Sequence, residues 1–303
     1  MKPRIIGICN QKGGVGKTTT AVNLAACLAV AEKKVLLIDL DPQGNATSGV
    51  GIDKHSVAGS SYQLLTTEAA GESLVVPTEI PSLSIVPASA DLVGAEIELT
   101  GVEGRETELR RALAGRFQDY DYIFIDCPPS LGLLTVNAMT AAQALLVPVQ
   151  CEYYALEGIA ELHRTIGLVA ANLNRALEIQ GIVLTMYDPR NNLCKQVADE
   201  VRNHFAAKVY ETMIPRNVRL SESPSFGKPI ILYDIHSKGS ASYLALAQEF
   251  LRREGAYVSS QESFREGVGL ADPNFTGAKA GDIVLRSPDD PGGRDPTQPP
   301  TAP

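Results

Sequence analysis

A glycine-rich segment near the start of the chain limits the possible folds more than any other feature. It reads Lys12-Gly-Gly-Val-Gly-Lys-Thr-Thr, follows an apolar run over residues 4–9, and opens a stretch with helical periodicity over residues 18–31. When a strand, a glycine loop and a helix follow in this order, backbone N–H groups and the helix N-terminus converge on one point, which suits a phosphate group. The sequence therefore predicts an α/β fold with a phosphate-binding loop.

The residues of this loop have separate expected roles in binding a polyphosphate. The glycines let backbone N–H groups turn inward, Lys17 reaches the β and γ phosphates, and the Thr18 hydroxyl ligates Mg²⁺. A strict Walker A pattern ending at Lys17 would place glycine at position 11, but the chain has Gln11 followed by a second lysine. The predicted nucleotide-binding residues of the loop are Lys12, Gly13, Gly14, Val15, Gly16, Lys17, Thr18 and Thr19.

Short β-branched runs alternate with amphipathic stretches along the first 254 residues. Ile123-Phe-Ile is an unbroken apolar run, which is typical of a strand covered on both faces. The pattern predicts one doubly wound, mostly parallel twisted sheet with helices on both faces. The expected strands are residues 4–9, 34–39, 83–87, 122–126, 144–149, 180–186 and 209–214, and the expected helices include residues 18–31, 158–174, 192–206 and 240–253.

The composition changes near residue 255. Beyond it the chain is rich in Pro, Gly, Ser and Asp and has no sustained apolar periodicity. We therefore expect one domain, which contains the phosphate loop, over residues 1–254 and a disordered tail over residues 255–303. No run approaches the ~18 apolar residues of a membrane span, and the apolar start is too short for a signal peptide, so a cytoplasmic protein is expected.

Two acidic sites complete the expected active centre. Asp126 ends the strand predicted over residues 122–126, where a carboxylate is expected to help hold Mg²⁺, although a turn residue is the alternative. Asp39 and Asp41 end the second strand, and residues two apart on an extended chain point the same way. Either carboxylate could orient an attacking water, and the alternative is that one of the two only caps the following loop.

Four motifs together resemble the deviant Walker A ATPases of the ParA/Soj chromosome-partitioning type. They are Lys12-Gly-Gly-Val-Gly-Lys-Thr-Thr, Asp39-Leu-Asp-Pro-Gln-Gly-Asn-Ala-Thr, Asp126-Cys-Pro-Pro-Ser and Ile214-Pro-Arg-Asn-Val-Arg-Leu-Ser-Glu-Ser-Pro-Ser, and the similarity covers roughly residues 3–253. The resemblance implies a P-loop ATPase that uses ATP and Mg²⁺ to segregate a chromosome or plasmid. It also implies an ATP-induced sandwich homodimer, nonspecific binding of double-stranded DNA, and hydrolysis stimulated by a ParB-type protein.

The same resemblance assigns roles to individual residues. It makes Lys12 the signature lysine that reaches the phosphates of the facing subunit and Asp41 the carboxylate that positions water, so Lys12, Lys17 and Asp41 are the expected catalytic residues. It also implies an adenine contact from a second part of the chain. The residues matched to that contact are Pro215, Arg216 and Asn217, and Met186 is expected on the same base.

The net charge of −8 argues against a generally basic nucleic-acid-binding protein, but residues 190–228 are locally basic. By resemblance, Arg190 and Arg219 match positions that contact DNA, and Lys195 is a third candidate. Ordinary surface side chains are the alternative for each. One subunit offers few phosphate contacts, so dimerisation is expected to be needed for useful affinity, and a nucleoid-associated protein would follow. The basic residues are Arg190, Lys195, Arg202, Lys208, Arg216, Arg219 and Lys228.

Three other functions share part of this pattern. A MinD-type membrane-cycling ATPase would end in a basic amphipathic helix, whereas residues 240–253 are better explained by packing on the sheet. An iron–sulfur ATPase resembling the nitrogenase iron protein would need thiolates that bridge a dimer, but Cys127 and Cys151 lie in no cluster motif. A nucleotide-gated scaffold without hydrolysis would not require Asp41.

Overall fold

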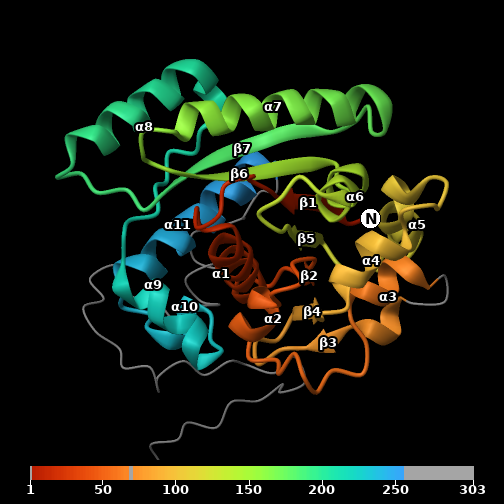
Figure 1. Ribbon diagram of the computed structural model, residues 1–303. Helices are drawn as coiled ribbons and strands as arrows, with labels where there is room; N and C mark the ends of the chain where they lie inside the picture. The colour runs from red at the N-terminus through yellow and green to blue at the C-terminus, as the bar shows by residue number, and fades with distance from the viewer. Residues whose placement is uncertain (1, 68–70, 256–303) are drawn as a thin grey trace, which may run out of the picture.

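A seven-stranded sheet forms the centre of the computed structural model, which describes residues 2–67 and 71–255 (Figure 1). The strand order is β3-β4-β2-β5-β1-β6-β7, and every pairing is parallel except that of β3 with β4. This confirms the predicted doubly wound, mostly parallel sheet. The strands are β1 (Arg4–Ile8), β2 (Val35–Asp39), β3 (Val76–Pro77), β4 (Leu83–Val86), β5 (Tyr122–Asp126), β6 (Ala144–Gln150) and β7 (Glu178–Thr185).

Helices cover both faces of this sheet (Figure 1). Alternate residues of β5 face opposite sides: Ile123 and Ile125 pack with residues of α3 to α8, while Tyr122 and Phe124 pack with residues of α1, α10 and α11. The α-helices are α1 (Lys17–Val30), α2 (Asn45–Gly49), α3 (Ser61–Thr66), α4 (Leu92–Glu98), α5 (Glu108–Leu113), α6 (Leu133–Ala141), α7 (Ala155–Asn172), α8 (Asn192–Phe205), α9 (Val218–Glu222), α10 (Ile230–Tyr233) and α11 (Lys238–Arg253). The 3-10 helices are η1 (Glu72–Leu74), η2 (Arg105–Thr107), η3 (Ala206–Lys208) and η4 (Ser223–Phe226).

The helix that follows the phosphate loop, α1, is buried around almost its whole circumference. Leu24 and Leu28 are fully buried, because α1 lies between the sheet and α11. The hydroxyls of Thr20 on α1 and Tyr243 on α11 are 3.2 Å apart and form a buried hydrogen bond. The first and the last helices of the described chain therefore pack directly against each other.

The predicted strand over residues 209–214 is wrong. In the structure this segment touches the edge strand β7 only at intervals: the backbone N–H groups of Tyr210 and Ile214 donate to carbonyls of β7, and no continuous ladder forms along the described segment. The short antiparallel strand β3 was not predicted, since two residues carry no periodicity.

The reason for the missing strand lies on α11. The carboxylate of Glu249 accepts hydrogen bonds from the backbone N–H groups of Glu211 and Thr212, at 2.8 Å each. The Thr212 N–H, which in a continuous strand would point to β7 as those of Tyr210 and Ile214 do, is therefore unavailable to β7. Arg253 donates to the same carboxylate at 3.0 Å. A side chain from the last helix thus determines the path of the segment that leads to residue 215.

We expect Glu249→Gln to lower the free energy of unfolding by about 2 kcal/mol, because hydrogen bonds to a charged acceptor are stronger than those to a neutral one. Burial alone would raise the pKa of Glu249, but the hydrogen bonds from Thr212 and Glu211 and the charge of Arg253 hold it below its usual value. This stabilisation is therefore present above the unfolded-state pKa and is lost as pH falls through the lower folded-state pKa. Urea unfolding at several pH values measures both effects.

The matched control for this prediction is Glu157→Gln, which makes the same chemical change on the exposed face of α7. Equal unfolding midpoints for Glu249→Gln and the control at neutral pH would contradict the prediction.

Two further sequence predictions concern the end of the chain and membranes. Residues 256–303, predicted to form most of a disordered tail, lie outside the described residues. Of the helices in the described part of the chain, none is long and apolar enough to cross a membrane.

Candidate active site

The phosphate loop connects β1 to α1 with two glycines in the left-handed region. Gly14 has φ 75° and Gly16 has φ 85°, conformations that residues with a Cβ rarely adopt, and Gly16 directly precedes the first turn of α1. The Thr185 hydroxyl of β7 donates to the Val15 carbonyl at 2.9 Å and holds the loop against the sheet. The unpaired N–H groups at the start of α1 give this loop the form of an anion-binding site.

Lys17 is the first residue of α1 and is almost completely buried. Its Nζ donates to the carbonyl oxygen of Lys12 at 2.9 Å, so the ammonium lies across the loop. Burial lowers the pKa of Lys17, and the nearby charge of Asp126 opposes part of that effect. The loop thus contains a buried ammonium group that a phosphate oxygen can pair with.

Asp126 is fully buried at the carboxyl end of β5, next to the ends of β1 and β2. Both of its carboxylate oxygens lack a hydrogen-bond partner among the described residues. Burial raises the pKa of Asp126 well above its usual range and Asp39 raises it further, outweighing the opposing effects of the Thr18 hydroxyl and Lys17. A buried carboxylate without a donor, close to a hydroxyl, fits a site for a hard cation such as Mg²⁺.

Asp39 and Asp41 lie in different environments, because β2 ends at Asp39 and the chain then turns. Asp39 is fully buried, and both of its oxygens accept hydrogen bonds: one from the Asp41 N–H and the other from the N–H and hydroxyl of Thr47 on α2. Burial raises the pKa of Asp39. One oxygen of Asp41 accepts the N–H of Gln43 at 2.9 Å, and its other oxygen has no partner among the described residues.

The two segments predicted to contact adenine lie side by side. Met186 follows β7 with φ 51°, and Tyr187 forms a bridge with Pro215. The Arg216 N–H donates to the Tyr187 carbonyl at 3.3 Å, and the side chain of Asn217 caps α9. The structure therefore brings Met186 close to the segment that contains Pro215, Arg216 and Asn217, although they are about 30 residues apart in sequence.

Most basic residues between positions 190 and 228 are paired with carboxylates. Arg190 binds Asp188 through two hydrogen bonds of 3.0 and 2.8 Å, which lower the pKa of Asp188 to about 2. Arg219 pairs with Glu222 at 2.9 Å and with Asp234 at 3.4 Å. Lys195 is exposed on α8 and has no ion pair with any described residue. The predicted DNA-binding side chains are thus all exposed, but two of them already have acidic partners.

The side chain of Lys12 forms an ion pair with Glu152, a residue that the sequence analysis did not identify. Glu152 lies between β6 and α7, and only the folded sheet brings this connection next to the phosphate loop. Thr47, which orients Asp39, was also missed as an individual residue.

Comparison with known proteins decides the family. A family model described as an AAA domain matches residues 3–179. The chromosome partitioning protein ParA of Myxococcus xanthus is 58% identical over 251 residues, which make up 83% of this chain and 89% of the relative. The sporulation initiation inhibitor protein Soj of Bacillus subtilis is 57% identical over 246 residues, 81% of this chain and 97% of the relative. This chain belongs to the ParA/Soj family of chromosome-partitioning ATPases.

A solved structure extends the ParA/Soj comparison to bound nucleotide. The cobyrinic acid a,c-diamide synthase of Mycobacterium smegmatis, solved with ADP and magnesium, has a TM-score of 0.73 and 36% identity, covering 84% of this chain and 96% of that one. The predicted P-loop ATPase fold is confirmed, and as a ParA/Soj protein the chain is an ATPase.

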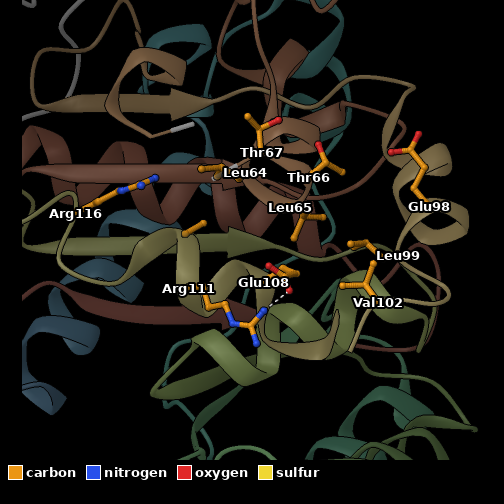
Figure 2. Close-up of a pocket in the computed structure, with 11 residues that line it drawn as sticks. Leu64, Leu65, Thr66, Thr67, Glu98, Leu99, Val102, Glu108, Arg111 and Arg116 are labelled. Carbon is orange, nitrogen blue, oxygen red and sulfur yellow. Dashed lines mark hydrogen bonds and ion pairs between the residues drawn. The ribbon is translucent and has the colours of Figure 1, made fainter. Parts of the chain in front are cut away.

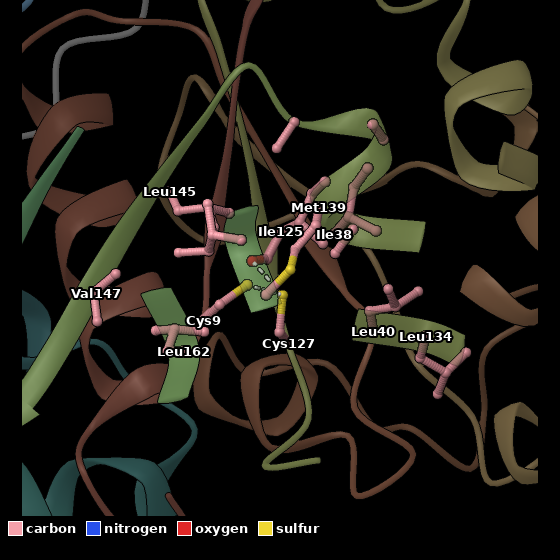
Figure 3. Packing of buried hydrophobic residues seen from close by; sticks show 14 of the residues in the cluster. Cys9, Ile38, Leu40, Ile125, Cys127, Leu134, Met139, Leu145, Val147 and Leu162 are labelled. Atoms are coloured by element: carbon pink, nitrogen blue, oxygen red, sulfur yellow. Dashed lines mark hydrogen bonds between the residues drawn. The ribbon is translucent and has the colours of Figure 1, made fainter. Parts of the chain in front are cut away.

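The structure also contains a cavity and a pair of buried thiols that belong neither to the phosphate loop nor to the acidic residues of the site. A cavity of about 720 Å³ lies between α3, α4 and α5 and is lined partly by Leu65, Glu98 and Arg111, but by no residue of the phosphate loop (Figure 2). The thiols of Cys9 and Cys127 are 2.8 Å apart in the apolar core (Figure 3). Because Cys127 is fully buried, its thiolate cannot bridge two subunits as an iron–sulfur ATPase would require.

Proposed function

We propose that this chain uses Mg²⁺-dependent ATP hydrolysis as a switch for DNA partitioning. In the ATP-bound state the protein would be a dimer bound to DNA. The observation that carries the proposal is the buried Asp126 carboxylate, which has no hydrogen-bond donor within the described part of the chain and lies near Lys17 and a phosphate loop that contains a second lysine. Identity above 55% to proteins named ParA and Soj supports the partitioning role.

Each subunit would contribute several groups to ATP binding and hydrolysis. Backbone N–H groups of residues 13–19 and the Lys17 ammonium bind the phosphates and neutralise charge that develops on the γ-phosphate. Thr18 and Asp126 would hold Mg²⁺, which when bound supplies further positive charge to the phosphates. Asp41, with one uncommitted oxygen, would orient the water that attacks the γ-phosphate in line, releasing ADP and phosphate.

The base and the second subunit complete the proposed site. Met186, Pro215, Arg216 and Asn217 would surround the adenine, which agrees with their closeness in the structure. Lys12 would reach the phosphates bound to the facing subunit, so that ATP links the two subunits. Equilibrium dialysis with ATP and ADP, combined with light scattering, tests whether ATP alone drives dimerisation.

DNA binding in this proposal relies on Arg190, Lys195 and Arg219. Phosphate contacts of this kind have no sequence preference, and doubling them in a dimer raises affinity. In the free subunit, Arg190 pairs with Asp188 and Arg219 with Glu222 and Asp234, so DNA phosphates would compete with these carboxylates. The resulting complex would associate with the nucleoid.

We expect the double variant Arg190→Gln/Arg219→Gln to dimerise with ATP but to lose most of its affinity for random-sequence duplex DNA. Neutral replacements are used because a negative charge at position 219 would repel Glu222 and Asp234 and disturb α9. Because the variant removes two arginine–phosphate pairs from each subunit, the slope of log affinity against log salt should decrease by roughly 4 in the dimer. Fluorescence anisotropy at several salt concentrations measures this slope.

The control for DNA binding is Lys33→Gln/Lys34→Gln, which removes the same charge from the loop between α1 and β2, at the opposite end of the sheet. If both double variants change the slope equally, the effect is one of net charge and the assigned interface is wrong.

The proposed cycle ends with the action of a ParB-type partner. A ParB-type protein would bind the ATP dimer and accelerate phosphate release, returning the subunits to the monomer. Phosphate release measured with DNA, with a ParB-type protein and with both tests this step; no acceleration with both present would contradict it.

A further inference from the structure

The side chain of Lys12 is held within its own subunit by two neighbours. Its Nζ forms an ion pair with the Glu152 carboxylate and lies 5.9 Å from the centre of the Tyr154 ring. The ion pair is only partly shielded from water, with the Lys12 and Glu152 side chains 40% and 34% exposed. Tyr154 packs edge-to-face against Tyr153, with ring centres 5.1 Å apart, and both rings are largely exposed.

The backbone around this ion pair is fixed from both sides. The side-chain amide of Asn10 donates to the Pro148 carbonyl on β6 at 2.7 Å, and its oxygen accepts the Lys12 N–H at 3.0 Å. The Cys151 N–H donates to the Thr185 carbonyl on β7 at 3.3 Å and anchors the residue before Glu152. These bonds place the start of the phosphate loop against the β6–α7 connection, so the ion pair is not a contact between two mobile loops.

The two lysines of the loop therefore have different partners in the isolated subunit. Lys17 donates to a neutral carbonyl, whereas Lys12 is neutralised by a carboxylate. An ammonium neutralised in this way attracts a distant phosphate only after the carboxylate is displaced. Any contact that Lys12 makes outside its own subunit therefore requires its ion pair with Glu152 to break.

We propose that Glu152 is a positioning residue that restrains Lys12 in the free subunit and so sets the ATP concentration needed for dimerisation. The inference rests on the proposed role of Lys12 across the dimer, but the restraint itself is a property of one subunit. ATP-driven pairing replaces two Lys12–Glu152 contacts, one in each subunit, with contacts to phosphate. Weakening the contact should therefore favour the dimer.

The restraint is tested first without nucleotide, by trace labelling of the full chain with acetic anhydride and mass spectrometry of the peptide that contains Lys12. Because an amine held against the Glu152 carboxylate and the Tyr154 ring is less accessible to the reagent, Glu152→Gln should increase the labelling rate of Lys12 roughly two- to five-fold, the range for breaking a partly exposed ion pair. Glu152→Asp, which keeps the charge on a shorter side chain, should give an intermediate rate. Glu157→Gln is the matched control and should leave the rate unchanged.

The consequence is tested by light scattering with a slowly hydrolysed ATP analogue. Glu152→Gln should lower the analogue concentration that gives half dimer, by roughly two-fold or more, while Glu157→Gln should not change it. A higher concentration requirement in Glu152→Gln would show that the carboxylate supports the dimer, which overturns the proposal.

The remaining outcomes separate this inference from the proposed function. Unchanged labelling of Lys12 in Glu152→Gln overturns the restraint, whatever the dimerisation result. Faster labelling with an unchanged requirement for the analogue overturns its role in assembly. Normal ATP-dependent dimerisation of Lys12→Ala would instead overturn the proposed function of Lys12. The labelling rates measured without nucleotide would still show whether Glu152 restrains Lys12.

Discussion

Lys17→Ala is expected to lose ATP binding altogether, whereas Lys12→Ala is expected to bind ATP but to remain a monomer. Lys17 is buried inside the loop, where its ammonium is available to phosphates of its own subunit. Lys12 points out of the loop toward Glu152, and its proposed phosphate contact is in the facing subunit. Isothermal titration calorimetry measures ATP binding, and light scattering measures dimerisation.

A suitable control for both lysine variants is Lys33→Ala, in the loop between α1 and β2, which should bind ATP and dimerise normally. A Lys12→Ala variant that dimerises with ATP and hydrolyses it at the usual rate would remove Lys12 from the proposed site. If Lys17→Ala bound ATP normally, the loop would not be the phosphate site.

Asp41→Ala is expected to reduce the rate of ATP hydrolysis by a factor of ~10²–10⁴ while leaving ATP binding intact, as for removal of a group that positions the water. This variant should persist as the ATP dimer on DNA, since hydrolysis releases the dimer in the proposed cycle. Asp39→Asn should behave differently: it weakens the hydrogen bonds to Thr47 and should lower thermal stability. Single-turnover phosphate release and melting temperatures distinguish the two variants.

Asp119→Ala, on the surface before β5, is the matched control and should keep both the rate and the stability. If Asp41→Ala hydrolysed ATP at the normal rate, another group would have to orient the water, and the assignment of the uncommitted oxygen of Asp41 would be wrong.

Local pattern predicted the strands of the parallel core closely, because their apolar runs end where the chain enters a loop. The expected strand over residues 122–126 agrees with β5, and residues 34–39 differ from β2 by one residue. The helix expected over residues 192–206 ends one residue earlier in the structure. The phosphate loop, Asp126 and the paired aspartates were predicted as site residues from their positions at or just after the ends of strands.

The remaining features depend on contacts between distant parts of the chain. Residues 209–214 have the composition of a strand, but Glu249, nearly 40 residues later, accepts the Thr212 N–H that a continuous ladder with β7 would need. The residue pattern alone left Asp39 and Asp41 as alternatives, and the family resemblance favoured Asp41; the hydrogen bonds from Thr47 to Asp39 give the two carboxylates different environments. Glu152 has no local motif, since its partner Lys12 is 140 residues away.

The packing of α11 on α1 has a consequence for synthesis of the protein on the ribosome. The phosphate loop is translated within the first 20 residues, but the face of α1 that carries Thr20 is covered only when Tyr243 has emerged. The segment that ends at residue 214 likewise acquires its shape only when Glu249 is present. A nascent chain without α11 would expose the apolar surface of α1 that α11 covers, so packing around the nucleotide site is completed only late in synthesis, once residues 238–253 have emerged.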